Sequence, residues 1–283
     1  RAVATQTLRE ARNREAFLER ANQILGFPID VISGREEARL IYQGVAKMLP
    51  QSAERRLVVD IGGRSTELIV GAGSEPQRME SYRVGSIAWS TRYFPGGQFS
   101  KRAFQIAEIA AKAVLDEALD AYGPQRWDIA YGSAGTIGAV GDVLVAAGEP
   151  AGVLTQSQLD WLMAKLLEAQ SADRLRLPGL KDDRRSIIAG GISILRAIFD
   201  LLRIERMYTA EGGLRHGLLS EMVGDAGQHF DVRTASVARL MAKFDVDTAH
   251  SARVEAVATT LFMQLSQPQG RATNEERDRN TRK

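Results

Sequence analysis

Asp60-Ile61-Gly62-Gly63-Arg64-Ser65-Thr66-Glu67 is a glycine turn that joins two apolar runs, residues 57–61 and 66–70, which are typical of β-strands. Glycines have no Cβ atom, so their backbone N–H groups can come close to phosphate oxygens, and Ser65 and Thr66 can add hydroxyl donors. Asp60, at the end of the first strand, can hold Mg²⁺ directly or through water. A lone pair of glycines is more often an ordinary hairpin turn, so the rest of the chain decides between the two interpretations.

The strand and glycine-turn pattern occurs twice more along the chain. A strand expected at residues 127–131 runs into Gly132-Ser133-Ala134-Gly135-Thr136, which begins an alanine-rich helix. A strand expected at residues 206–209 follows a helix at residues 184–202 and runs into Gly212-Gly213-Leu214-Arg215. Three glycine turns at strand ends, interleaved with helices, indicate an α/β protein.

Capping residues and helical periodicity place the other elements. Ser33 and Glu36 stand at capping-box spacing and begin a helix that ends before Pro50, while Thr155 and Gln158 cap a later one. The remaining expected elements are a helix at 7–25, strands at 29–32 and 79–84, a helix from 100 to 123, and amphipathic helices at 232–244 and 248–267.

Composition limits the possible functions. The chain has 283 residues, of which 44% are hydrophobic and 25% charged, as expected of a globular protein, and no apolar run is long enough to cross a membrane. The absence of cysteine excludes disulfides and thiolate metal sites, so a metal ion would need oxygen ligands. A formal charge of +2, from 37 basic and 35 acidic residues, does not indicate nucleic-acid binding. We expect a cytoplasmic protein.

Residues 60–68 match, at every position except Arg64, the Asp-Ile-Gly-Gly-Gly-Ser-Thr-Glu-Leu signature of the exopolyphosphatase / guanosine pentaphosphate phosphohydrolase (Ppx/GppA) family. Upstream, Ser33-Gly34-Arg35-Glu36-Glu37-Ala38 is similar to the Ser-Gly-x-Glu-Glu-Ala segment of that family. The other two glycine turns also resemble the family, and the resemblance covers about residues 1–265. It implies an actin-like, ribonuclease-H-like α/β fold of two lobes that bind phosphate between them.

The resemblance also implies roles for individual residues. Glu37 would be the general base that activates water, and Asp60 and Glu67 would hold Mg²⁺. On sequence alone, a solvated glutamate favoured by the helix dipole is the better explanation of Glu37, and only the resemblance reverses that choice. The residues expected to bind phosphate lie in the three glycine turns: Gly62, Gly63, Arg64, Ser65, Thr66, Gly132, Ser133, Gly135, Thr136, Gly212, Gly213 and Arg215.

The resemblance divides the chain into four parts. Residues 1–41 would be a remnant of the first lobe, 42–225 the second lobe, 226–268 the start of a helical domain, and 269–283 a disordered tail. The first phosphate loop of the family has no counterpart in the sequence, so we expect an incomplete first lobe and little activity from the chain as given.

Three functions follow as expectations. The first is an Mg²⁺-dependent exopolyphosphatase that releases terminal phosphate from inorganic polyphosphate, acting as a homodimer without membrane or nucleic-acid partners. The second is a pppGpp 5′-phosphohydrolase, which shares the chemistry and differs in nucleotide recognition. The third is a non-catalytic module that binds phosphate or nucleotide, because Arg64 and the order of Ser133 and Ala134 depart from the family pattern.

Overall fold

The computed structural model describes residues 1–224, 241 and 246–266, and the chain divides into two compact units, Arg1–Gly224 and Asp225–Lys283. All expected site residues lie in the first unit. In the second unit, α12 (Thr248–Ser266) confirms the helix expected at 248–267. The helix expected at 232–244 lies outside the described residues except for Met241. Within the described ranges, no helix is long and apolar enough to span a bilayer.

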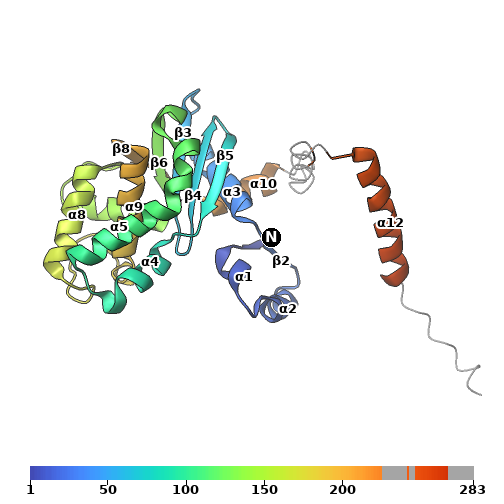
Figure 1. Cartoon of the computed structure of the whole chain (residues 1–283), viewed down its shortest axis with the longest axis horizontal. Helices are drawn as coiled ribbons and strands as arrows, with labels where there is room; N and C mark the ends of the chain where they lie inside the picture. The colour runs from blue at the N-terminus through green and yellow to red at the C-terminus, as the bar shows by residue number, and fades with distance from the viewer. Residues whose placement is uncertain (225–240, 242–245, 267–283) are drawn as a thin grey trace, which may run out of the picture. The chain divides into compact units, whose positions relative to one another are not determined.

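A six-stranded mixed sheet with strand order β5-β4-β3-β6-β8-β7 forms the centre of the first unit (Figure 1). Strands β3, β4 and β5 form an antiparallel meander, β6 and β8 continue in parallel to β3, and β7 runs antiparallel at the far edge. Because β3, β6 and β8 are parallel, the glycine turns that follow them share one edge of the sheet. The strands are β3 (Arg55–Ile61), β4 (Thr66–Ala72), β5 (Glu75–Tyr82), β6 (Ile129–Ser133), β7 (Val153–Thr155) and β8 (Arg206–Thr209).

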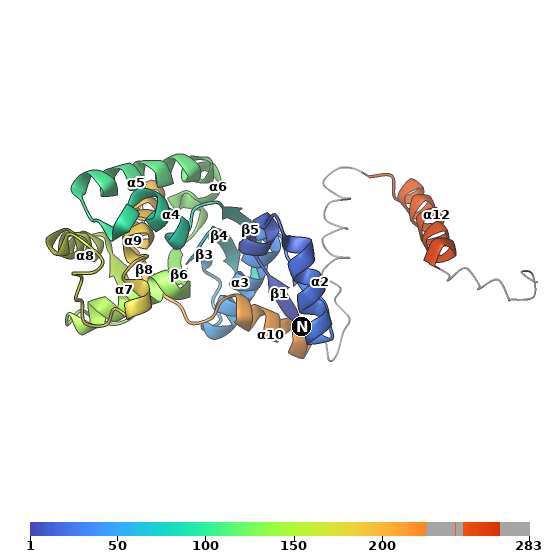
Figure 2. The same cartoon turned by 90° about the horizontal axis from the view of Figure 1, so that it is seen from below.

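Helices cover both faces of the sheet, and both cartoon views show this arrangement (Figures 1 and 2). One face packs against α3 (Gly34–Met48), on which α10 (Leu214–Gly224) docks in turn. The opposite face carries the larger apolar core. The helices on that side are α4 (Ser86–Tyr93), α5 (Lys101–Leu115), α6 (Leu119–Tyr122), α7 (Ala134–Ala146), α8 (Gln156–Ala169) and α9 (Ile188–Leu202).

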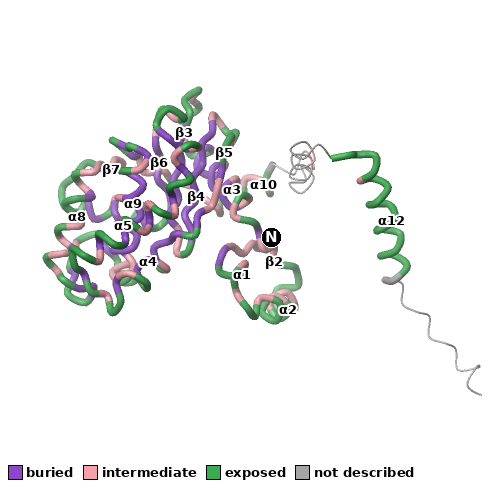
Figure 3. Tube along the Cα trace, viewed as in Figure 1, coloured by how far each residue is buried: buried purple, intermediate pink, exposed green. Residues whose placement is uncertain are grey.

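Burial follows this layering (Figure 3). Buried residues concentrate in the central strands and in α9, where a run of apolar side chains is enclosed by the sheet and α5. Short 3₁₀ turns connect several of the helices: η1 (Pro95–Gly97), η2 (Asp116–Ala118), η3 (Pro124–Arg126) and η4 (Asp182–Arg184).

The segment before α3 forms a separate two-stranded parallel sheet. Strand β1 (Ala2–Ala4) pairs with β2 (Ile29–Val31), and α1 (Gln6–Glu10) and α2 (Arg14–Leu25) connect them. The single helix expected at 7–25 is therefore wrong, because Ala11 takes an extended conformation that ends α1. Helix α2 contains no buried residue within this unit.

Several other expectations are confirmed with shifted ends. Ser100 caps α5, and Thr155 forms a complete capping box with Gln158. Helix α5 ends at Leu115 instead of continuing to Gly123, and α9 begins at Ile188 instead of 184. Ser33 accepts a hydrogen bond from the Glu36 N–H, but the Glu36 carboxylate binds Arg39 and does not complete the capping box.

Candidate functional site

Four polar side chains form a row across strands β5, β4, β3 and β6, which we call the carboxylate row: Ser81, Glu67, Asp60 and Ser133. The strand register places Glu67 opposite Asp60, Asp60 beside Ser133, and Glu67 opposite Ser81. Side chains alternate between the faces of a strand, so the row lies on the face that α3 covers, two residues beyond the apolar cluster under that helix.

Hydrogen bonds hold the two carboxylates of the row in place. The Ser133 hydroxyl donates to Asp60 Oδ2 at 2.6 Å, and the Ser81 hydroxyl donates to Glu67 Oε1 at 2.7 Å. Asp60 is 7% exposed and Glu67 only 1%. Two buried carboxylates side by side are costly to ionise unless a cation or further donors compensate them.

Glu37 reaches the same place from the first turn of α3. It is buried, at 8% exposure, and its Oε2 accepts a hydrogen bond at 3.0 Å from Arg9 Nη1 of α1. The same Arg9 nitrogen also donates to the Ile32 carbonyl, which fixes α1 beside the start of α3. The structure therefore does not place Glu37 in solvent, which was its alternative interpretation.

The pKa values of these acids show how closely they are placed. Burial, together with the charges of Glu37 and Asp60, raises the pKa of Glu67 to about 8. Burial and the charge of Glu37 raise the pKa of Asp60 to about 6, against the hydrogen bond from Ser133. Burial also raises the pKa of Glu37, although Arg9 opposes the rise. Three acids thus share one electrostatic environment.

The first glycine turn lies at the end of this row. Its carbonyl groups accept hydrogen bonds from the start of α4, since Ser86 N donates to Gly62 O and Ile87 N to Gly63 O. The N–H groups of Gly63, Arg64 and Ser65 donate to no described residue, so they remain available to an anion.

Two of the side chains expected to bind phosphate in this turn have other partners. The buried Thr66 points to the opposite face of the sheet, where its hydroxyl donates to the Val84 carbonyl at 2.6 Å. The Arg64 guanidinium donates to Glu10 of α1 at 3.4 Å, in an exposed ion pair.

The second glycine turn is short, because β6 passes directly into α7 at Ser133 and Ala134. Ala134 has a φ of 71°, a left-handed conformation that is rare for a residue with a Cβ atom. Ser133 occupies the N-cap position, but its hydroxyl serves Asp60, and the Thr136 hydroxyl donates to the Ile61 carbonyl at 3.1 Å. The first-turn N–H groups of α7 therefore have no side-chain cap.

A guanidinium lies over the start of α7. A Cβ atom added to Gly135 would stand 2.7 Å from Arg184 Nη1, so this glycine makes room for the arginine. Arg184 pairs with the exposed Asp183, next in sequence, at 3.8 Å, and so long an ion pair at the surface is weak. A cation at a helix N-terminus has a favourable partner only if an anion binds there too.

The third glycine turn brings backbone to the carboxylate row. Gly212 and Gly213 have backbone φ values of 104° and 148°, which residues other than glycine rarely adopt. A Cβ at Gly212 would meet the Gly44 carbonyl of α3, and one at Gly213 would stand 4.0 Å from Asp60 Oδ2. Arg215, which follows, is exposed on α10.

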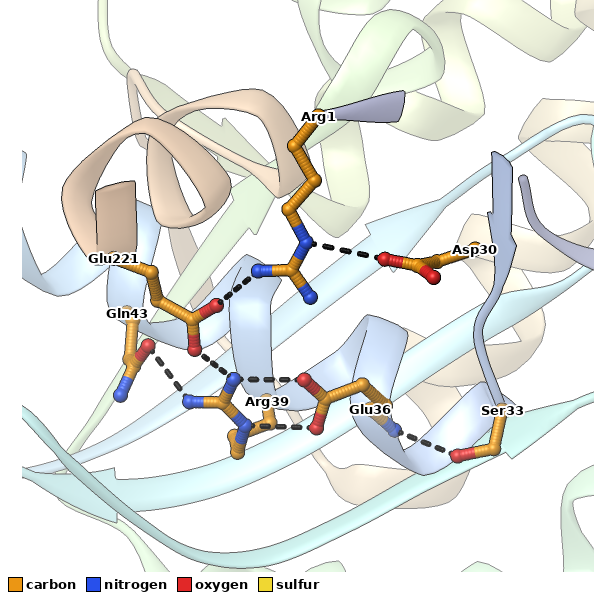
Figure 4. A network of polar contacts seen from close by, with 7 residues as sticks. All are labelled: Arg1, Asp30, Ser33, Glu36, Arg39, Gln43 and Glu221. Carbon is orange, nitrogen blue, oxygen red and sulfur yellow. Dashed lines mark hydrogen bonds and ion pairs between the residues drawn. The ribbon is translucent and has the colours of Figure 1, made fainter. Parts of the chain in front are cut away.

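A polar network fixes α10 and the β1–β2 sheet to α3 (Figure 4). Arg39 forms a two-pronged ion pair with Glu36 at 2.8 Å and also binds Glu221 of α10 and Gln43. Glu221 in turn accepts a hydrogen bond from Arg1, which also contacts Asp30. This network holds the helix that carries the third glycine turn.

Sequence reasoning missed Arg9, Arg184 and Ser81. Arg9 lies 28 residues before Glu37, and Arg184 lies in an Asp-Asp-Arg-Arg run that is typical of a solvated surface. Ser81 would have followed only from the β4–β5 register. Among the expected residues, Thr66 points to the face of the sheet opposite the carboxylate row, and Arg215 is exposed on α10.

Comparison with known proteins gives one consistent result. The sequence model of the Ppx/GppA phosphatase family matches residues 1–226. The model of Ppx/GppA phosphatase, domain III, matches residues 232–281. A protein of Vibrio parahaemolyticus named guanosine-5′-triphosphate,3′-diphosphate pyrophosphatase is 40% identical over 277 residues, which are 96% of this chain and 55% of that protein. A Vibrio cholerae protein of the same name is 41% identical over 264 residues, 93% of this chain and 52% of its own length. The chain thus spans about half the length of the curated relatives it matches.

Solved structures agree with the expected fold. The Ppx/GppA protein of Aquifex aeolicus has a TM-score of 0.65 and 27% identity, over 80% of this chain and 74% of its own. An exopolyphosphatase of Cytophaga hutchinsonii has a TM-score of 0.68 at 22% identity, over 79% of this chain and 74% of its own, which supports the fold alone. The actin-like α/β class expected from the sequence is confirmed.

Proposed function

The chain belongs to the Ppx/GppA phosphatase family, and on that basis we propose that it carries the catalytic centre of a phosphohydrolase that removes the terminal 5′-phosphate of pppGpp. The observation that supports this most is the meeting of Glu37, Asp60 and Glu67 beside three glycine turns. Acidic side chains beside backbone N–H groups that have no partner among the described residues suit phosphoryl transfer. This reaction depends on positioning the phosphate and on stabilising the charge on its oxygen atoms.

Glu37 is the general base of this proposal. Burial raises its pKa, so its carboxylate takes a proton from water more readily than a solvated glutamate does. Arg9 opposes that rise and so favours the ionised form that a general base requires. The arginine also orients the carboxylate through the 3.0 Å hydrogen bond, so both of its effects prepare Glu37 to bind the attacking water.

Asp60 and Glu67 are the proposed ligands of Mg²⁺. Their oxygen atoms suit this hard cation, and burial, together with neighbouring carboxylates, raises both pKa values, a cost that a bound cation would offset. No group of three or more acidic or histidine side chains in the described ranges is arranged to hold a metal by itself, so water and phosphate oxygens would complete the shell. When bound, Mg²⁺ would neutralise charge on the phosphate oxygens.

The phosphate groups would be held mainly by backbone. The N–H groups of the first turn and of the start of α7, which lack side-chain partners in the described chain, would donate to phosphate oxygens, and Arg184, beside Gly135, would add a cation. We include Arg9 and Arg184 among the proposed phosphate ligands. Glycine at 212 and 213 lets the third turn come close to Asp60 without a side chain in the way.

Polyphosphate is the second candidate substrate. The sequence analysis ranked polyphosphate first among the expected substrates, whereas the names of relatives at about 40% identity favour pppGpp. Both substrates end in a phosphoanhydride, which the same centre would cleave. A homodimer and a cytoplasmic location remain predictions.

The test is phosphate release by the complete protein with Mg²⁺, from pppGpp and from long-chain polyphosphate at matched concentrations of terminal phosphate. We expect a higher kcat/KM for pppGpp. A higher value for polyphosphate would favour the exopolyphosphatase, and ligand binding without release from either would favour the non-catalytic module.

A further inference from the structure

An ion-pair cluster joins helix α1 to the first glycine turn. Arg64 Nη2 lies 3.4 Å from one carboxylate oxygen of Glu10, and Arg83 Nε lies 3.3 Å from the other. The side-chain amide of Gln6, which is 7% exposed, also donates to Glu10 at 3.1 Å and so holds the carboxylate in place on α1. Among the described residues, the two arginines share this one carboxylate, so the cluster keeps an excess positive charge.

Backbone packing keeps the two arginines side by side. Arg83 follows β5 directly, and two residues later Gly85 passes so close to the turn that a Cβ there would stand 2.4 Å from the Arg64 nitrogen. The Thr66 hydroxyl, which donates to the Val84 carbonyl at 2.6 Å, ties the same two segments together. The spacing of the arginines is therefore set by the backbone as well as by Glu10.

The cluster borders the proposed reaction centre. Arg64 belongs to the turn whose free N–H groups are the expected phosphate donors. Arg9, which precedes Glu10 on α1, binds Glu37 at 3.0 Å. The Arg64 and Arg83 side chains are 49% and 82% exposed, so they run from the turn into solvent.

The two ion pairs with Glu10 are easily replaced. Both are longer than 3.2 Å and exposed, and such pairs contribute little to stability. A phosphate group offers more negative charge than a carboxylate, and guanidinium groups bind it through two parallel hydrogen bonds. Arg64 is also the one position at which residues 60–68 depart from the family signature, and it adds a cation where a glycine would have none.

We propose that Arg64 and Arg83 bind a phosphate group of the substrate other than the one that is cleaved, and that this group displaces Glu10. The terminal phosphate would lie on the backbone N–H groups of the turn, and the arginines reach outward, where the rest of the substrate must extend. The inference rests on the proposed pppGpp hydrolysis, in which the phosphate next to the cleaved one remains on the product ppGpp.

The first test is direct binding of ppGpp, GDP and ADP to the complete protein. Arg64→Gln/Arg83→Gln should weaken ppGpp binding at least about 10-fold, and weaken GDP and ADP by similar factors, because the arginines contact phosphate and not the base. The matched control is Arg126→Gln/Arg206→Gln, which removes two exposed arginines near the start of β6 and β8, at the opposite end of the sheet. It should bind like the unaltered protein, and unchanged ppGpp binding in the first variant would overturn the proposal.

The second test uses the sign of the Glu10 effect. Glu10→Gln should strengthen ppGpp binding about 3-fold, because a neutral amide no longer competes with phosphate for the arginines. The same change should bring no gain in the Arg64→Gln/Arg83→Gln background. Weaker binding in Glu10→Gln would show that the carboxylate supports the site instead of being displaced, and a gain that persists without the arginines would also overturn the proposal.

The third test is turnover by the complete protein. Arg64→Gln/Arg83→Gln should raise KM for pppGpp and leave inhibition by inorganic phosphate unchanged, because free phosphate would occupy the turn backbone. Equal losses for substrate and inorganic phosphate would overturn the assignment of the arginines to a second phosphate group. Absence of turnover in the unaltered protein would instead overturn the proposed function, and the ppGpp binding results would still decide on the arginines.

Discussion

Asp60 and Glu67 are paired directly across the β3–β4 hairpin, on the face of the sheet covered by α3, and both are almost fully buried. Among the described residues, neither carboxylate has a basic partner. Arg9 instead binds the neighbouring Glu37. The pair is therefore a place where negative charge is costly, and a cation or protons must offset that cost.

The stability of the metal-free protein should fall as pH rises. The pKa of Asp60 is raised from 3.8 to about 6 and that of Glu67 from 4.5 to about 8, so the folded state keeps protons that the unfolded chain loses. Unfolding is thus favoured with increasing pH between about 4 and 8. Thermal unfolding with a chelator present should give a lower Tm at pH 8 than at pH 5. Glu67→Gln should flatten this slope, and an unchanged slope would contradict the placement of Glu67.

Asp60→Asn should increase the Mg²⁺ concentration needed for half-maximal activity by about 10-fold or more, because a neutral amide oxygen attracts a hard cation less than a carboxylate does. The measurement is a titration of phosphate release against Mg²⁺ at saturating pppGpp. Asp128→Asn, in an exposed ion pair with Arg55 at the opposite end of the sheet, is the control and should leave the titration unchanged. An identical titration for both variants would remove Asp60 from the metal site.

Gly135→Ala should impair phosphate binding while the protein stays folded. The new methyl group would displace the Arg184 guanidinium, which is the flexible end of a side chain and can move away. Gly138→Ala, one turn later in α7, would meet nothing within 4 Å and should be neutral or slightly stabilising. We expect KM for pppGpp to rise in the first variant only. Equal KM values in both would show that Arg184 does not act on the substrate.

Gly217→Ala should destabilise the fold by about 2 kcal/mol or more, because overpacked contacts between rigid groups cannot relax. Its Cβ would lie 1.9 Å from the Leu40 carbonyl of α3, which is backbone within a helix. Urea unfolding would measure the loss, with Gly138→Ala as the reference. A midpoint equal to that of the reference would mean that α10 does not pack on α3 as described.

Local chemistry made much of the fold predictable. The turn at Gly62 and Gly63, the cap at Ser33 and the capping box at Thr155 depend on residues a few positions apart, and all three lie where the sequence indicates. Helix α4 was missed because its N-cap, Gly85, has no side chain to signal a start. The break between α1 and α2 was missed because residues 11–13 contain neither proline nor glycine.

The candidate site was predictable only in part, because its neighbours are set by strand pairing. The sequence places Asp60 and Glu67 on either side of one turn, but only the register brings Ser133 and Ser81 to their carboxylates. Arg9 and Arg184 come from segments whose patterns are typical of surface helices and loops.

The central claim is that Glu37 is the base of a phosphohydrolase centre, and the most direct test compares Glu37→Gln with Glu36→Gln in the complete protein. Both changes remove one negative charge from the first turn of α3, but the Glu36 carboxylate binds Arg39 and lies outside the carboxylate row. Phosphate release from pppGpp with Mg²⁺ should fall at least about 100-fold in Glu37→Gln, with ppGpp binding retained, and stay near the unaltered rate in Glu36→Gln. Similar rates in the two variants would contradict the account.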